Sequence, residues 1–259
     1  MSELRSPVMT LKTRQLEPEL MDDPEIETGD HDRALEGLAR LNRLARAAAP
    51  FQEELGTILA SRETRRLEAT ADDRPLVVLD VATGSGDLVV TLERWRRVRA
   101  PSSTIHWIAC DRSRHALERA GARAAEIDLD LETIERDVTR DELPACDLVF
   151  CSLFLHHLTA TEVTTVLRRM VSTARIGGLV TDLTRSRLGW LMAALIPRLV
   201  TSSPVVHVDA VGSVRAAFSR TEFKALVDAA GIPRAQVFDS FPERQAVRWR
   251  ADARVGAAS

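Results

Sequence analysis

Two glycines directly follow an apolar run that contains one acid. The run covers residues 76–81, and Asp80 is its acidic member. A glycine has no Cβ atom, so its backbone can approach a ligand closely. The carboxylate of Asp80 stands where it can interact with a cationic or ammonium-bearing ligand. The ligand-binding turn that we predict consists of Ala82, Thr83, Gly84, Ser85 and Gly86.

One alternative for this turn is a binding site for a nicotinamide dinucleotide. Such a site requires the pattern Gly-x-Gly-x-x-Gly after a strand. Gly84 and Gly86 satisfy the first two positions, but no glycine stands at the third. The spacing therefore disfavours a nicotinamide dinucleotide.

A second acid, Asp111, directly follows the predicted second strand, which covers residues 104–110. A carboxylate at the end of the second strand of a parallel sheet can accept hydrogen bonds from the hydroxyl groups of a ribose. The alternative is that Asp111 caps the following helix, but Ser113 can serve as that cap. We therefore expect Asp111 to bind a ribose.

The first of these motifs resembles the opening motif of class I S-adenosylmethionine-dependent methyltransferases. That motif reads apolar-apolar-acid-apolar-Gly-x-Gly-x-Gly, and here residues 81–87 read Val-Ala-Thr-Gly-Ser-Gly-Asp. Ala82 departs from the general motif, but the methyltransferases of quinone biosynthesis also have alanine there. The resemblance implies that Asp80 and residues 82–86 bind S-adenosylmethionine and that S-adenosylhomocysteine is the product.

The same resemblance assigns the residues around the nucleoside. Asp111 would hold the ribose, and Arg112 would lie against the adenine. Asp137 follows a predicted third strand at residues 131–135 and would meet the adenine amino group, while the backbone amide of Val138 would meet a ring nitrogen. The alternative for Asp137 is a solvated loop acid.

Residues 146–158 resemble the fourth motif of the family, an Asp-led strand followed by Leu-His-His. Cys151 and Ser152 would lie beside the reactive methyl group. A hydroxyl acceptor also profits from a base near neutral pH, for which histidine is the usual choice. The candidate bases are His156, His157 and His207, of which we favour His157 or His207, although a histidine between leucines is more often structural. We see no metal-ligand cluster and expect no metal.

Alternating apolar strands and amphipathic helices must position these residues. Their order predicts a Rossmann-like α/β fold with a doubly wound, seven-stranded sheet. Six strands should be parallel and one antiparallel, because the connection at residues 242–244 is short enough for an antiparallel pair. A capping box at residues 159–162 begins a helix that we expect Gly177 and Gly178 to end.

The domain organisation that we predict has two parts. Residues 1–74 form an N-terminal tail and a helical cap, with the polar start either mobile or ordered as a strap. Residues 75–259 form the methyltransferase core, and residues 183–218 form an insertion that acts as a substrate lid. This insertion contains an apolar helix at residues 188–200. The polar residues expected to bind substrate are Arg185, Trp190, Asp209 and Arg215. The alternative is that the apolar segment is a packing or dimer surface.

The composition restricts the partners. Apolar residues make up 45% of the 259 residues, charged residues make up 28%, and the net charge is −3, which disfavours nucleic acid as a partner. Three cysteines without a CxxC pair argue against a disulfide framework or a zinc site. No run approaches the roughly 20 apolar residues of a membrane span. We expect a cytoplasmic monomer or homodimer.

The sequence therefore predicts a methyltransferase for a small, largely apolar or aromatic acceptor. A phenol, a quinol or a polyketide-like compound would suit an apolar wall with a few polar groups. O-methylation is the reaction we expect. C- or N-methylation of a related small molecule remains open, as does a binding or scaffold protein of the same fold without catalysis.

Overall fold

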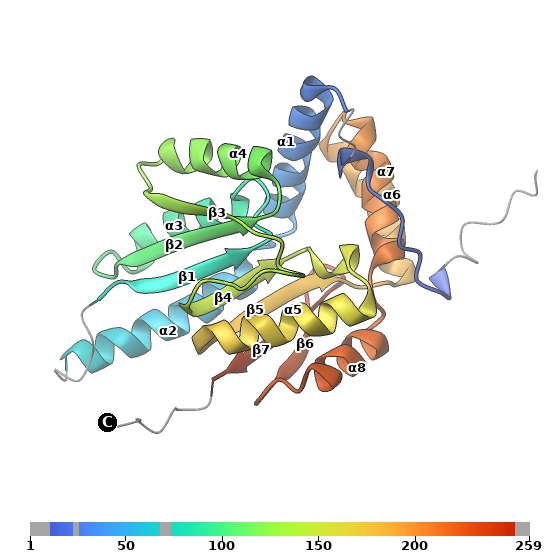
Figure 1. Cartoon of the computed structure of the whole chain (residues 1–259). Coiled ribbons are helices and arrows are strands. Elements are labelled where there is room, and N and C mark those ends of the chain that lie inside the picture. The colour runs from blue at the N-terminus through green and yellow to red at the C-terminus, as the bar shows by residue number, and fades with distance from the viewer. Residues whose placement is uncertain (1–10, 23–25, 68–73, 252–259) are drawn as a thin grey trace, which may run out of the picture.

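The computed structural model describes residues 11–22, 26–67 and 74–251. They form a seven-stranded sheet in the order β3-β2-β1-β4-β5-β7-β6, with helices on both faces (Figure 1). Every neighbouring pair is parallel except those of β7, which is antiparallel to both β5 and β6. The predicted fold class is therefore confirmed.

The strands are β1 (Leu76–Val81), β2 (Ile105–Asp111), β3 (Leu131–Glu135), β4 (Cys146–Ser152), β5 (Ala174–Leu183), β6 (Gln236–Ser240) and β7 (Arg244–Arg250). The helices are α1 (Thr28–Leu44), α2 (Ala49–Leu67), α3 (Asp87–Arg99), α4 (Arg114–Ala125), α5 (Ala160–Thr173), α6 (Arg187–Val200), α7 (Pro204–Ala216) and α8 (Arg220–Ala230). The described residues also include two short 3-10 helices, η2 (Leu20–Asp22) and η3 (Leu155–His157).

The sheet is buried on both faces, which explains why its central strands are almost continuously apolar. In β4, Leu148 and Phe150 pack toward α2 and α3, while Val149 and Cys151 pack toward α5 and α8. The alternation follows from the two-residue period of a strand. The result is a rigid sheet whose carboxyl edge can present loops to a ligand.

Gly177 and Gly178 do not end α5, and the prediction that they would is wrong. The helix ends at Thr173, and both glycines lie inside β5. A Cβ atom on Gly178 would stand only 2.4 Å from the ring of Trp249, which belongs to β7. The two glycines therefore make room for the fully buried Trp249 rather than stopping a helix.

The segment between β5 and α8 contains two helices, of which the sequence analysis identified only α6. Ser203 caps α7, and Pro204 occupies its first turn, where its missing N–H costs no hydrogen bond. The helices α6 and α7 pack against each other and against α1. These three helices stand together at the right of Figure 1 and form what we name the cap. By contrast, α2 packs with α3 on a face of the sheet.

Residues 11–22 run along the cap as a strap, one of the two forms expected for the start of the chain. The backbone N–H groups of Leu20 and Met21 donate to the carboxylate of Asp209, at 2.8 and 3.0 Å. Arg14 donates to the carbonyl oxygen of His156 at 2.7 Å. The strap thus joins α7 to the segment that follows β4.

Candidate functional site

The glycine turn lies at the switch point of the sheet. It follows β1, whose neighbours are β2 on one side and β4 on the other. Open α/β sheets bind ligands beyond the carboxyl ends of their strands at such a point. Ala82, Gly84 and Gly86 all have positive φ angles, of 54°, 54° and 74°. For Ala82 this left-handed conformation costs energy, and such strain concentrates at functional sites.

Asp80 lies beneath this turn and is almost completely buried, with 2% of its surface exposed. Its Oδ2 atom accepts a hydrogen bond from the Thr83 hydroxyl at 2.7 Å. Burial raises the pKa of Asp80, the Thr83 hydrogen bond lowers it, and the nearby charge of Asp111 raises it; together they bring the pKa to about 7. The carboxyl group is therefore poised to ionise when a cationic ligand arrives.

Asp111 connects the turns that follow β1 and β2. One carboxylate oxygen accepts from the backbone N–H of Gly84 and the other from that of Ser113, each at 2.9 Å. These two bonds orient the carboxylate and leave lone pairs on both oxygens for further donors. The next residue, Arg112, is exposed at the same edge of the sheet.

The third predicted motif lies in the loop after β3. The Oδ1 atom of Asp137 accepts from both the backbone N–H and the hydroxyl of Thr139, at 2.9 and 2.6 Å, and these bonds lower the pKa of Asp137. Val138 is buried, and its carbonyl oxygen accepts from Arg169 at 2.8 Å. The local geometry of this loop is therefore well defined.

A cavity of about 470 Å³ joins the glycine turn to the cap. Its cofactor side includes Asp80 and residues 82–85, and Ser152 lies on it at the end of β4. Cys151 is fully buried and does not reach the cavity. The apolar wall comes mainly from α1 and α6, with Leu35, Leu38, Leu41, Met192, Ala193 and Ile196. Asp111, Arg112, Asp137 and Val138 lie outside this cavity.

His156 lies on the cavity wall but is 4% exposed. Its Nδ1 atom is 2.6 Å from Asp182 Oδ1, and its Nε2 atom is 3.8 Å from Glu19 Oε1. Burial alone would lower the pKa of His156, but the carboxylates of Asp182 and Glu19 outweigh it and raise the pKa to about 10. At neutral pH this imidazole is protonated in the ligand-free protein.

His157 also lines the cavity and is more accessible than its neighbour. The two histidine rings lie 4.3 Å apart, and His157 Nε2 is 4.0 Å from Glu19 Oε1. Glu19, His156 and His157 each have one atom that could bind a metal ion, and these three atoms all lie within 4.8 Å of one another. The sequence did not indicate this grouping. His207 lies elsewhere, with its Nε2 atom 2.8 Å from the carbonyl oxygen of Thr201.

The four residues predicted to bind substrate do not line this cavity. Arg185 is buried and donates to the carbonyl oxygen of Ala217 at 2.9 Å and to Glu222 at 2.8 Å. The Asp209 carboxylate holds the strap through two backbone N–H groups. Trp190 on α6 and Arg215 on α7 also lie away from the cavity wall.

Polar residues that were not predicted from the sequence line the cavity instead, among them Glu19, Asn42, Glu243 and Arg244. Arg244 begins β7, is 6% exposed, and donates through Nη2 to Asn42 Oδ1 at 3.2 Å. Burial lowers the pKa of Arg244 to about 10, although the charge of Asp182 opposes this shift. These residues come from the strap, α1, the β6–β7 connection and the start of β7, and no local spacing relates them.

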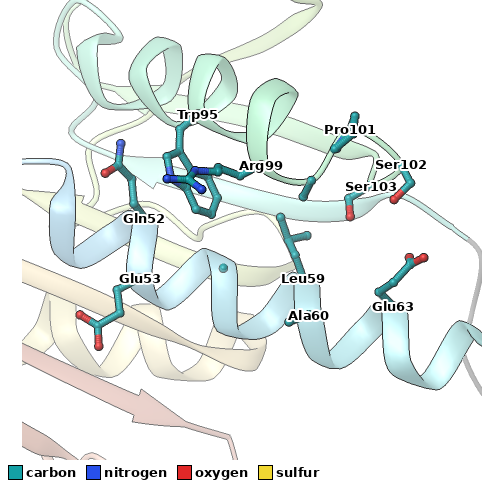
Figure 2. A pocket seen from close by; sticks show the side chains of 12 residues that line it. Gln52, Glu53, Leu59, Ala60, Glu63, Trp95, Arg99, Pro101, Ser102 and Ser103 are labelled. Atoms are coloured by element: carbon teal, nitrogen blue, oxygen red, sulfur yellow. The ribbon is translucent and has the colours of Figure 1, made fainter.

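A second cavity of about 560 Å³ lies between α2 and α3 (Figure 2). It is lined by Gln52, Leu59, Trp95 and Arg99, together with residues 100–103. Because that last segment precedes β2, this cavity is at the amino edge of the parallel strands. It is therefore on the opposite edge from the glycine turn and takes no part in the site.

The mostly parallel sheet, the glycine turn at its switch point and the adjoining cavity are the features of a Rossmann-like cofactor-binding fold. Residues 78–178 match the family model described as a methyltransferase domain. This match confirms the predicted resemblance to S-adenosylmethionine-dependent methyltransferases, whose methyl donor is the predicted cofactor. No curated protein matches the chain.

Solved structures share the fold at low identity. An O-methyltransferase family 2 protein from Planctomyces limnophilus DSM 3776, crystallised with apigenin, is 17% identical, with a TM-score of 0.55, and the match covers 89% of this chain and 63% of that one. A protein proposed to be an O-methyltransferase from Nostoc punctiforme PCC 73102 is also 17% identical, with a TM-score of 0.58 and coverage of 94% and 66%.

A third structure matches along its whole length. It is the plantazolicin methyltransferase BpumL, crystallised with S-adenosylhomocysteine and a triazolic desmethylPZN analog. It is 12% identical, with a TM-score of 0.52, and the match covers 88% of this chain and 100% of that one. These likenesses establish the fold. Within the described residues, no helix is long and apolar enough to cross a membrane.

Proposed function

We propose that this protein transfers a methyl group from S-adenosylmethionine to a hydroxyl oxygen of a small, largely apolar or aromatic acceptor. Phenols, quinols and polyketide-like compounds are the acceptors that we favour. The observation that carries this proposal is the single cavity that joins the glycine turn to an apolar wall and to two histidines. An apolar pocket with a few convergent polar groups suits such a ligand.

The cofactor would lie over the carboxyl ends of β1, β2 and β4. It supplies an electrophilic methyl group, and the protein's part is to hold it and to exclude water. Asp80 would pair with its ammonium group, since that charge keeps a buried carboxylate ionised. The carboxylate of Asp111, already oriented by two backbone N–H groups, would accept from the ribose hydroxyls.

The remaining cofactor contacts follow the family motifs. Arg112, Asp137 and the backbone of Val138 would surround the adenine. Ser152, at the end of β4, would lie near the methyl group, with Cys151 supporting it from the core. In-line transfer then depends on holding donor and acceptor at the right distance and angle in a dry site.

His157 is the base that we propose for deprotonating the acceptor hydroxyl. It lies on the cavity wall, and the Glu19 carboxylate 4.0 Å from Nε2 can stabilise the imidazolium that forms. His156 is less suitable, because a pKa raised to about 10 keeps it protonated at neutral pH. We propose that His156 instead fixes the strap and Asp182 around the site.

The test is methyl transfer from radiolabelled S-adenosylmethionine to a panel of phenols, quinols, amines and activated carbon acids. We expect labelled methyl ethers and a reduction of kcat in His157→Ala by about a hundredfold or more, as is usual for the loss of a general base. The affinity of that variant for S-adenosylhomocysteine should stay unchanged. His207→Ala is the matched control and should retain the activity.

Other products would redirect the proposal. Methylation only at nitrogen or carbon would replace O-methylation with the corresponding activity. Full activity of His157→Ala would show that His157 is not the catalytic base. Cofactor binding without transfer to any member of the panel would favour a binding or scaffold protein.

A further inference from the structure

The cavity holds a buried cation whose hydrogen-bonding capacity is largely unused. Arg244 is 6% exposed and lines the cavity with its strand neighbour Leu183. Its Nη2 atom donates to Asn42, but the Nε and Nη1 atoms are buried without a hydrogen-bond partner. Unpaired buried donors are rare and costly in folded proteins, and a charged one is the costliest, so each requires an explanation.

No carboxylate of the described residues forms an ion pair with Arg244. The charge of Asp182 acts on Arg244, but the two side chains form no ion pair. The Oδ1 atom of Asp182 accepts from the backbone N–H of Leu183 and lies 2.6 Å from His156 Nδ1. Its Oδ2 atom is buried without a hydrogen-bond partner and does not reach the guanidinium group. The guanidinium group therefore lacks the internal counter-ion that would make it a structural element of the core.

The charges on the cavity wall direct an anion to this position. Arg244 is the only lysine or arginine among the described residues that line the cavity. The acids nearest the acceptor side have donors of their own, since Glu243 accepts from the Ser186 hydroxyl and Glu19 from the Ser213 hydroxyl. His156, the other cation on the wall, is already paired with Asp182. An anionic group in the cavity would therefore find its attractive partner at Arg244.

The position of Arg244 in the sheet separates it from the cofactor motifs. In the order β1-β4-β5-β7, two strands stand between the glycine turn and the start of β7. With neighbouring strands about 4.8 Å apart, the two places are roughly 14 Å from each other. Arg244 thus belongs to the acceptor end of the cavity, at a span that an aromatic molecule can bridge.

We propose that Arg244, steadied by Asn42, binds a carboxylate of the methyl acceptor. The acceptor is then an apolar or aromatic hydroxy acid, with its carboxylate at β7 and its hydroxyl group toward the glycine turn. This inference rests on the proposed function and deepens it. A carboxylate satisfies the unpaired donors with charge-assisted hydrogen bonds, which are about twice as strong as neutral ones.

The experiment compares acids with their amides, which have similar size but no charge. The probes are 6-hydroxy-2-naphthoate, 4-hydroxycinnamate and 3-hydroxybenzoate, each with its amide, titrated calorimetrically into the protein saturated with S-adenosylhomocysteine. We expect at least one acid to bind the wild type about tenfold or more tightly than its amide. In Arg244→Met this preference should disappear.

Two controls separate the possible causes. Arg248→Met removes an arginine from the same strand that does not line the cavity, and it should keep the preference for the acid. If Arg244→Met does not fold, Arg244→Gln provides the same comparison. Asn42→Ala should weaken the preference without abolishing it, because the guanidinium group remains.

Several results would overturn the proposal. It fails if no acid binds the wild type better than its amide, or if Arg244→Met keeps the preference. It also fails if Arg244→Met loses affinity for S-adenosylhomocysteine, since Arg244 would then bind the cofactor carboxylate. A wild-type protein that binds no S-adenosylhomocysteine would instead refute the proposed function.

Discussion

Binding of S-adenosylhomocysteine should strengthen as the pH rises toward neutrality, because Asp80 must ionise to pair with the ligand's ammonium group. In the ligand-free protein, burial raises the pKa of Asp80 to about 7, so the neutral acid dominates below that pH. A ligand that requires the carboxylate form then pays for the deprotonation. The apparent affinity for this ligand equals the intrinsic affinity multiplied by the ionised fraction of Asp80.

The magnitude follows from the pKa. With a value of about 7, roughly 3% of the Asp80 carboxyl groups are ionised at about pH 5.5 and roughly 75% at about pH 7.5. The affinity should therefore rise about 25-fold over this interval. An ordinary surface aspartate with a pKa near its usual value of 3.8 would give almost no change.

Calorimetric titration at several pH values, in buffers of different ionisation enthalpy, measures both the affinity and the proton released on binding. Asp80→Asn should bind weakly and show no pH slope. Asp87→Asn is the matched control, since Asp87 also lines the cavity but is paired with Arg123 at 2.6 Å, and it should keep most of the slope. A flat profile for the wild type would refute the assignment of Asp80 to the ammonium group.

Three further changes test other parts of the account. Asp111→Ala should weaken binding of S-adenosylhomocysteine by about a hundredfold in calorimetry, as expected for the loss of two charged hydrogen bonds. The control variant Ser113→Ala should bind normally. Equal affinity of both variants would contradict the assignment of Asp111 to the ribose. Gly178→Ala should lower the free energy of unfolding in urea by about 3 kcal/mol, because the new Cβ meets the buried tryptophan of β7, while Gly212→Ala, with nothing within 4 Å, should not. The raised pKa of His156 stabilises the fold fully below about pH 6.5, and this stabilisation is lost as the pH rises toward 10. The thermal unfolding midpoint of the wild type should therefore fall across this pH window. The midpoint of His156→Asn should fall less.

The sheet and its ligand-binding edge could be predicted because local patterns determine them. A strand buried on both faces must be almost continuously apolar, as residues 76–81 are, and a turn that exposes its backbone needs glycine. Gly178 shows where this reasoning fails. A glycine after a helix commonly ends that helix. Here a glycine is required because any larger side chain would clash with Trp249, about seventy residues away in sequence. Only the tertiary structure reveals that contact.

The acceptor end of the site depends on contacts between distant segments. Glu19, Asn42 and Arg244 come from the strap, α1 and β7, and each looks like an ordinary surface residue in its local sequence. Arg185 and Asp209 were predicted to bind substrate from their charge within the insertion. In the structure their charges hold the strap and the start of α8, since buried charges require partners.

The most direct test of the central claim is calorimetric titration of the wild-type protein with S-adenosylhomocysteine at neutral pH, with NAD as the control ligand. The glycine turn, Asp80 and Asp111 predict binding in the micromolar range and none for NAD. Absence of binding to S-adenosylhomocysteine, or comparable binding of NAD, would contradict the account.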